Sequence, residues 1–147
     1  DIFKLLPFLD RSEMVIGTRT ASSYILDGAN MGSFFKWGNW FVAKMIEALY
    51  NFSYLSDVGC TFRVYKRTSI GNMNLDKFQG DGSFGMELLL RFVMQKKVVT
   101  QVPVNYKERL GVSHYSGDFL KAFKLGSKMI GIVILRRIGS RNYYEKS

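Results

Sequence analysis

The chain has 147 residues, of which 47% are hydrophobic and 15% aromatic, so it has enough apolar side chains for a packed core and is too apolar for a disordered segment. One cysteine and one histidine exclude an internal disulfide framework and the usual multi-cysteine zinc sites. The formal net charge of +9 leaves three partner classes open: nucleic acid, an anionic membrane surface and a phosphorylated substrate.

The first residues are predicted to form the end of a helix. Residues 1–9 are apolar on one side, and Pro7 limits how far helix can extend before it. Because the chain starts at Asp1 and within this segment, we interpret its start as a cut in a longer chain. A short strand is predicted over residues 13–17, followed by a loop rich in Thr, Ser, Gly and Asn over residues 18–33.

A helix of about five turns is predicted from Phe34 to Phe52, with Ser33 as its N-cap. Its aromatic and aliphatic residues cover more of the circumference than a normal amphipathic stripe does. Two interpretations therefore stay open: a well-buried core helix, or a helix whose Trp and Phe side chains face lipid.

The segment after this helix is the most informative part of the chain. Asp57 precedes Gly59, and a strand is predicted from Cys60 to Tyr65. An aspartate at such a place is most often a turn residue, and the functional alternative is a general base or a group that positions an acceptor. Cys60 is expected to be a small buried hydrophobic residue, because the sequence shows no base to activate it.

The remaining elements continue the alternation of helices and strands. We expect a short helix over residues 68–73, a helix from Phe84 to Gln95 and a strand from Lys97 to Tyr106, whose Pro103 indicates an edge strand or a strand end. A loop over residues 107–117 leads into a final helix from Asp118 to Ile138. Such alternation favours an α/β fold.

The final helix is both basic and apolar. From Lys107 to Ser147 there are nine Lys/Arg and three Asp/Glu, so this stretch carries +6 of the net +9. A basic, strongly apolar helix is typical of an anionic membrane interface. Its longest apolar run, Met129 to Leu135, is far below the ~20 residues needed to span a bilayer. An ordinary docked helix is the alternative, and nucleic-acid binding would favour a less aliphatic face.

Polar residues follow the last predicted strand. Arg109, Gly111 and Ser113 lie on the predicted loop, and an arginine fork can contact two phosphate oxygens at once. A solvated loop arginine is the default interpretation of this pattern when it is taken alone. His114 comes next, and it is expected to be a neutral loop residue or an additional donor to phosphate.

Together, the run Asp57-Val58-Gly59-Cys60-Thr61-Phe62-Arg63 and the Pro103 to Ser113 segment resemble the second half of an inverting glycosyltransferase of family 2, of the polyprenyl-phosphate type. The resemblance covers nearly the whole chain. It implies the C-terminal portion of a GT-A α/β domain, with a mixed sheet, flanking helices and a C-terminal amphipathic helix. It also implies sugar transfer from a nucleotide sugar to an acceptor such as a polyprenyl phosphate.

The resemblance also suggests a role for particular residues. Asp57 would be catalytic, Arg109 and Ser113 would bind the donor pyrophosphate, Arg19 would face a phosphate, and Lys36 and Glu87 would lie on the acceptor side. Two positions depart from the family pattern. Leu110 alone separates Arg109 from Gly111, and Lys36 stands where many relatives have arginine, so a point charge replaces a fork.

Enzymes of this family hold Mg²⁺ or Mn²⁺ through an Asp-x-Asp motif, which this sequence lacks. Residues 1–117 are therefore expected to be the acceptor-side half of the catalytic domain and residues 118–147 an interfacial helix and tail. The chain alone is expected to bind no metal and to be inactive. The parent enzyme is expected to be peripheral on the cytoplasmic face of a membrane, without nucleic acid as a partner.

Two alternatives of other classes stay open, namely a non-catalytic membrane-surface module and a basic nucleic-acid-binding domain. Within the glycosyltransferase interpretation, Asp57→Asn in the complete enzyme is expected to reduce turnover with little change in fold.

Overall fold

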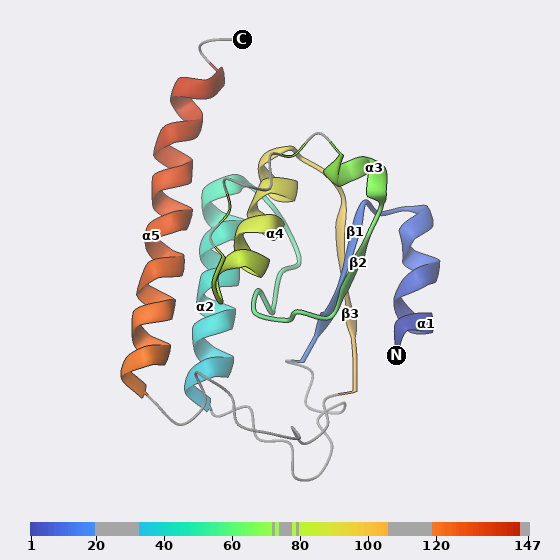
Figure 1. Cartoon of the computed structure of the whole chain (residues 1–147), viewed down its shortest axis with the longest axis horizontal. Coiled ribbons are helices and arrows are strands. Elements are labelled where there is room, and N and C mark those ends of the chain that lie inside the picture. The colour runs from blue at the N-terminus through green and yellow to red at the C-terminus, as the bar shows by residue number, and fades with distance from the viewer. Residues whose placement is uncertain (20–32, 72, 74–77, 79, 106–118, 145–147) are drawn as a thin grey trace.

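Strands and helices alternate along the chain, as the sequence predicts. The computed structural model describes residues 1–19, 33–71, 73, 78, 80–105 and 119–144 (Figure 1). Its elements in chain order are α1 (Ile2–Leu5), the 3-10 helix η1 (Leu6–Asp10), β1 (Met14–Thr18), α2 (Ser33–Tyr50), β2 (Arg63–Tyr65), α3 (Arg67–Ile70), α4 (Phe84–Met94), β3 (Val99–Pro103) and α5 (Phe119–Tyr144).

The three strands form one mixed sheet in the order β2-β1-β3. β1 pairs antiparallel with β2, with Ile16 opposite Arg63, and parallel with β3, with Thr18 opposite Pro103. Pro103 therefore ends an edge strand of the described sheet, which confirms its predicted position. The mixed sheet with flanking helices confirms the predicted α/β class.

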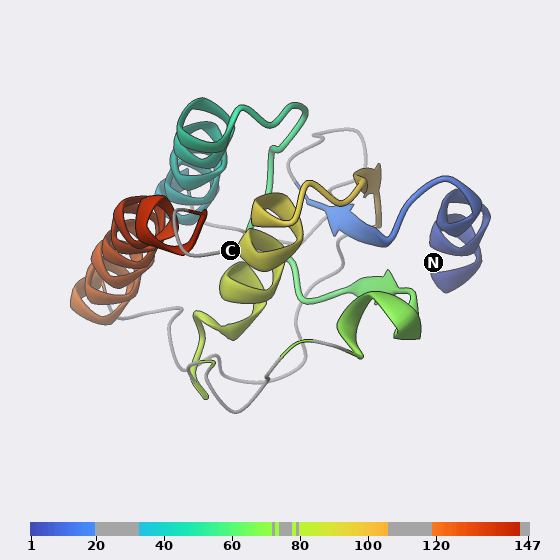
Figure 2. The ribbon, with the colours of Figure 1, turned by 90° about the horizontal axis from the view of Figure 1, so that it is seen from above.

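Helices cover both faces of the sheet. On one face, α1 contributes Leu5 to a small cluster with Val15, Val102 and Val104. On the other face lie α4, α2 and α5, with α2 and α5 side by side on the outside (Figures 1 and 2). Because side chains alternate along a strand, Met14 and Ile16 of β1 point to the larger helical layer and Val15 to α1.

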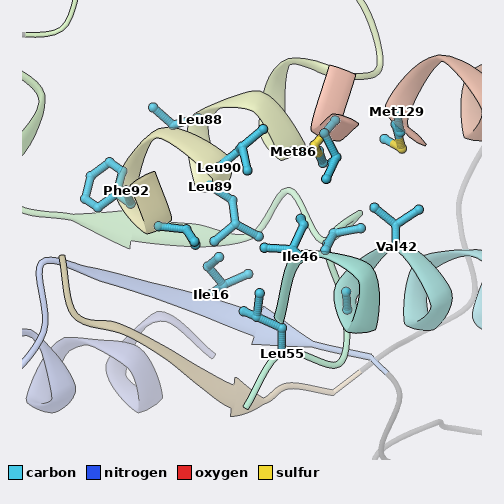
Figure 3. Close-up of a cluster of buried hydrophobic side chains, with 14 of the residues drawn as sticks. Ile16, Val42, Ile46, Leu55, Met86, Leu88, Leu89, Leu90, Phe92 and Met129 are labelled. Carbon is cyan, nitrogen blue, oxygen red and sulfur yellow. The ribbon is translucent and has the colours of Figure 1, made fainter. Parts of the chain in front are cut away.

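The main core lies between the sheet and the helical layer. Ile16, Ile46, Leu55 and Leu89 meet there with no solvent exposure above 1% (Figure 3). Helix α5 belongs to this core through Met129 and Val133, and the Tyr50 hydroxyl of α2 donates to the carbonyl oxygen of Val133 at 2.8 Å. Among the described helices, none combines the length and the apolarity that crossing a bilayer requires.

Several boundaries differ from the prediction. Helix α2 begins at Ser33, which is thus its first residue and not its N-cap, and ends at Tyr50. It ends there because Asn51 takes a positive φ of 51° and the N–H of Phe52 donates to the carbonyl oxygen of Glu47 at 3.1 Å, as at many helix ends. Strand β2 is shorter than predicted because only Arg63–Tyr65 pair in register with β1. Helix α5 continues to Tyr144, past Gly139.

The parallel pairing brings two strand ends together. β1 and β3 both end at the same edge of the sheet, and the N–H of Val104 donates to the carbonyl oxygen of Thr18 at 3.2 Å. The N-terminal ends of α2 and α5 lie at this end of the molecule (Figure 1). In mixed and parallel α/β sheets, polar sites form at the carboxyl ends of strands, so this edge is the natural place for a site.

Candidate functional site

Two residues predicted to be functional lie in direct contact at this edge. The guanidinium of Arg19, just after β1, donates from Nε to Asp57 Oδ2 at 2.8 Å and from Nη2 to Oδ1 at 2.9 Å. The backbone N–H of Arg19 also donates to Oδ2 at 3.2 Å. Such a bidentate pair fixes the plane of the guanidinium as well as its position.

The carboxylate of Asp57 is fully enclosed. Its residue is 0% exposed, and the N–H of Gly59 donates to Oδ1 at 3.0 Å in addition to the three donors of Arg19. A carboxylate has about four lone-pair sites, so these donors occupy its accepting capacity. This arrangement favours a role in orienting Arg19 over the general-base role that the sequence suggested for Asp57.

Gln101 of β3 holds the backbone that carries this carboxylate. Its Oε1 accepts from the N–H of Ser56 at 2.7 Å and from the Ser56 hydroxyl at 2.9 Å, while its Nε2 donates to the carbonyl oxygen of Asp57 at 2.7 Å. The Ser56 hydroxyl also lies 2.9 Å from that of Thr18, the last residue of β1. The segment around Asp57 is thereby tied to both neighbouring strands.

Helix α2 touches the same segment. A Cβ at Gly59 would lie 2.5 Å from Oδ1 of Asn39, so a larger residue there would displace the Asn39 side chain of α2. Lys36 lies three residues before Asn39 on this helix, partly buried. The contact therefore places the first turns of α2, with Lys36, at the end of the sheet that carries Arg19.

Glu87, the other predicted acceptor-side residue, lies away from this pair and contacts a helix. It is 4% exposed in the first turn of α4, and its Oε1 lies 3.5 Å from Nη2 of Arg136 on α5. The pair links α4 to α5.

Arg63 and Cys60 have structural roles in the fold. The Arg63 guanidinium donates from Nη1 to the carbonyl oxygen of Gly85 at 2.5 Å and from Nη2 to that of Cys60, and burial lowers the pKa of Arg63. Burial also raises the pKa of the Cys60 thiol, against the opposing effect of the Arg19 charge. Cys60 is 2% exposed, which confirms the predicted buried hydrophobic residue.

Arg109, Ser113 and His114 lie outside the described residues, as does most of the predicted loop over residues 18–33. The described part of the chain ends there at Asn105, two residues after β3. The segment that carries Arg109 thus follows the strand end that lies next to Arg19. The roles of Arg109, Ser113 and His114 therefore stay predictions.

The sequence did not reveal three residues of the site, namely Gln101, Ser56 and Asn39. Gln101 stands within an otherwise unremarkable strand, and its partners lie 44 and 45 residues away. The one available sequence signal was the polar amide side chain of Gln101 between Val99 and Val102, in a strand that pairs with β1. Polar side chains inside a sheet usually find hydrogen-bond partners.

Among the described residues, we find no site for the divalent metal that the family resemblance implies. The sequence has no Asp-x-Asp, and within the described ranges no group of three His, Cys, Asp or Glu side chains could hold an ion.

Comparisons with protein-family models, with curated proteins and with solved structures found no match to this chain.

Proposed function

We propose that this chain provides the acceptor side of a sugar-transferring enzyme, similar to the family 2 glycosyltransferases of GT-A fold, and that Arg19 binds an acceptor phosphate there. The observation that carries the proposal is the Arg19–Asp57 pair at the carboxyl end of β1. Family resemblance supplies the reaction, and the geometry of the pair supports a site for an oxyanion.

In this proposal Asp57 and Gln101 are positioning residues. Asp57 holds the Arg19 guanidinium in one plane, and Gln101 holds the backbone of Asp57. A guanidinium that is already ordered loses less conformational freedom when it binds a phosphate. An acceptor phosphate is ionised at neutral pH, so the attacking oxygen needs no general base. Inversion at the anomeric carbon would follow from a single in-line displacement.

Lys36 is the second cation of the proposed site. It lies on the first turns of α2, the helix that contacts Gly59 next to Asp57. A lysine on this helix adds positive charge without fixing the orientation of the phosphate. Arg109 and Ser113 are proposed to bind the donor pyrophosphate, and no step is assigned to a metal held by this chain.

Binding tests this proposal more directly than turnover, because the chain carries no Asp-x-Asp for the donor side. Short-chain isoprenyl phosphate would be titrated into the 147-residue chain by calorimetry, with the corresponding isoprenol as the uncharged control. We expect binding of the phosphate only, weakened by at least about tenfold in Lys36→Gln and in Arg19→Lys, since a lost charge-assisted contact amounts to about 1.5–3 kcal/mol.

Circular dichroism of both variants would control for loss of fold. Equal affinity for the phosphate and the alcohol, or unchanged binding in both folded variants, would contradict the proposed phosphate site.

A further inference from the structure

The outer edge of β2 presents backbone groups that no strand pairs. β2 is an edge strand of the described sheet, because only β1 pairs with it there. The N–H of Lys66 donates to the carbonyl oxygen of Glu13 at 2.9 Å, so the backbone of Lys66 faces β1. Since backbone groups alternate along an antiparallel strand, the N–H and C=O groups of Arg63 and Tyr65 point away from β1, and no described residue provides them with a partner. We call this row of groups the β2 edge.

The other described edge of the sheet is protected against a further strand. The N–H of Val104 donates to the carbonyl oxygen of Thr18, so the backbones of Gln101 and Pro103 in β3 face outward. Pro103 has no N–H to offer, and natural sheets use proline in this way to block pairing at an edge. The side chain of Gln101 also holds Ser56 beside this strand. Of the two edges, β2 is therefore the one that can accept a strand.

Unpaired cations gather at the carboxyl end of β2. Four exposed cations have no carboxylate partner among the described residues, namely Arg11, Lys66, Arg67 and Lys96. The backbone of Glu13 bonds to Lys66 on one side and to the carbonyl oxygen of Val98 on the other, both at 2.9 Å, so the segments that carry these cations converge. The Glu13 carboxylate accepts from the N–H of Val98 at 2.7 Å and forms no ion pair with Lys66. We call the four cations the basic end.

An acidic, extended segment fits both features. A strand that adds to a sheet edge satisfies the outward N–H and C=O groups, and Glu or Asp side chains on it would neutralise Lys66 and Arg67. A second copy of β2 fits less well, because residues 61–71 contain no Asp or Glu and so offer no counter-charge. Nucleic acid phosphates would use the cations but, as acceptors only, would leave the outward carbonyl groups unpaired.

We propose that the β2 edge and the basic end bind an acidic, extended segment of a partner protein, which joins the described sheet as a strand next to β2. This site lies apart from the proposed phosphate site, because Arg19 follows the last residue of β1, whereas Lys66 bonds to Glu13, the residue before β1 begins. The inference goes beyond acceptor binding. The two proposals are tested with different ligands, so either can fail without the other.

Amide hydrogen exchange, followed by NMR on the 147-residue chain, tests this directly. The probe is a short acetylated peptide in which Glu alternates with Thr, and its control carries Lys in place of each Glu. An N–H without a partner exchanges quickly and becomes protected when it pairs. With an excess of the acidic peptide, we expect exchange at Arg63 and Tyr65 to slow by about tenfold or more, and we expect no protection from the Lys peptide.

Matched variants separate strand addition from general attraction to positive charge. Tyr65→Pro removes one outward N–H, at an edge position where proline is tolerated, and Tyr65→Val keeps it. We expect binding of the acidic peptide to weaken about tenfold in Tyr65→Pro and to stay within about twofold in Tyr65→Val. Lys66→Glu should weaken binding about fivefold, whereas Lys124→Glu, an equal charge reversal at an exposed position of α5, should have little effect.

Three results would overturn the proposal. The first is unchanged exchange at Arg63 and Tyr65 with the acidic peptide. Because this measurement uses the wild-type chain, it decides the question even where Tyr65→Pro does not fold. The second is equal peptide binding by Tyr65→Pro and Tyr65→Val, with circular dichroism confirming that both are folded. The third is peptide-free self-association in sedimentation equilibrium that Tyr65→Pro abolishes, which would identify a second copy of the chain as the occupant of the β2 edge.

Discussion

Gln101 donates from its Nε2 to the backbone carbonyl oxygen of Asp57 at 2.7 Å, while its Oε1 accepts the N–H of Ser56 at 2.7 Å. One amide side chain on β3 thus holds the backbone on both sides of the Ser56–Asp57 pair, in the segment that carries the enclosed carboxylate. The arrangement of the site therefore depends on a residue of the neighbouring strand, far away in sequence.

Replacing Gln101 by Met is expected to destabilise the fold. Met keeps the side-chain volume but leaves the Ser56 N–H and the Asp57 carbonyl without these partners, which we expect to lower the free energy of unfolding by about 1–3 kcal/mol. Urea unfolding of the variant and of wild type measures this difference. Gln95→Met, at the exposed end of α4, is the matched control and should change stability by less than about 0.5 kcal/mol. Similar effects at both positions would refute the role of Gln101.

A second prediction concerns the stability of the Arg19–Asp57 pair. It revises the sequence-based expectation that Asp57→Asn would change the fold little. Asp57 is 0% exposed and the Arg19 side chain 15%, so the Asn variant leaves a poorly solvated guanidinium without its counter-charge. We expect a loss of about 3–5 kcal/mol in the free energy of unfolding. Arg19→Lys keeps the charge and should lose less, about 1–3 kcal/mol. Thermal or urea unfolding of Asp57→Asn at wild-type stability would show that the pair does not hold this segment.

The sequence predicted the types of the elements well, because strand alternation and helical period are local signals. It identified Arg19 and Asp57 as polar residues at element ends, but not their contact, since pairing across 38 residues follows from the register of β1. Gln101 was missed for the same reason: its hydrogen-bond partners lie 44 and 45 residues away, and a polar amide among valines was its only local signal. The end of α2 was placed two residues too late because the apolar pattern was extended past Asn51, although asparagine is one of the residues that take the left-handed conformation at helix ends.

Contact between α2 and the Asp57 segment can be tested at Gly59. In Gly59→Ala the new methyl group would lie 2.5 Å from Asn39 Oδ1, so the Asn39 side chain or the helix has to move. Overpacking of this kind costs about 1–3 kcal/mol. Asn39→Ala removes the obstructing atoms, so the double variant should be more stable than the sum of the single effects implies. A double-mutant cycle in urea measures this coupling, and strict additivity would contradict the contact.

Acid unfolding should report on the attachment of α5. Hydrogen bonds from Lys128 of α5 and from Ser83 lower the pKa of Asp81 from its usual 3.8 to about 2. The folded state thus favours the ionised carboxyl, so its stabilisation is complete above about pH 4 and is lost as the pH falls towards 2. Because the Asp81 side chain is 41% exposed, we expect a contribution below about 1 kcal/mol.

Asp81→Asn should therefore be less stable than wild type at pH 5 and equally stable near pH 2. Asp10→Asn, on the exposed end of η1, is the control. A stability difference for Asp81→Asn that does not change between these pH values would exclude this assignment of the acid-sensitive contact.

The two sides of α5 can be compared at adjacent residues. Val133 is 0% exposed in the core, whereas Ile134 is 42% exposed on the outer side of α5. Val133→Ala removes two buried methyl groups and leaves a cavity, so we expect a loss of about 2 kcal/mol in the free energy of unfolding. Ile134→Ala should change stability by less than about 0.5 kcal/mol, since Ala has the higher helix propensity and little burial is lost. Urea unfolding without lipid measures both. A large loss in Ile134→Ala would contradict the assignment of this side chain to the exposed side of α5.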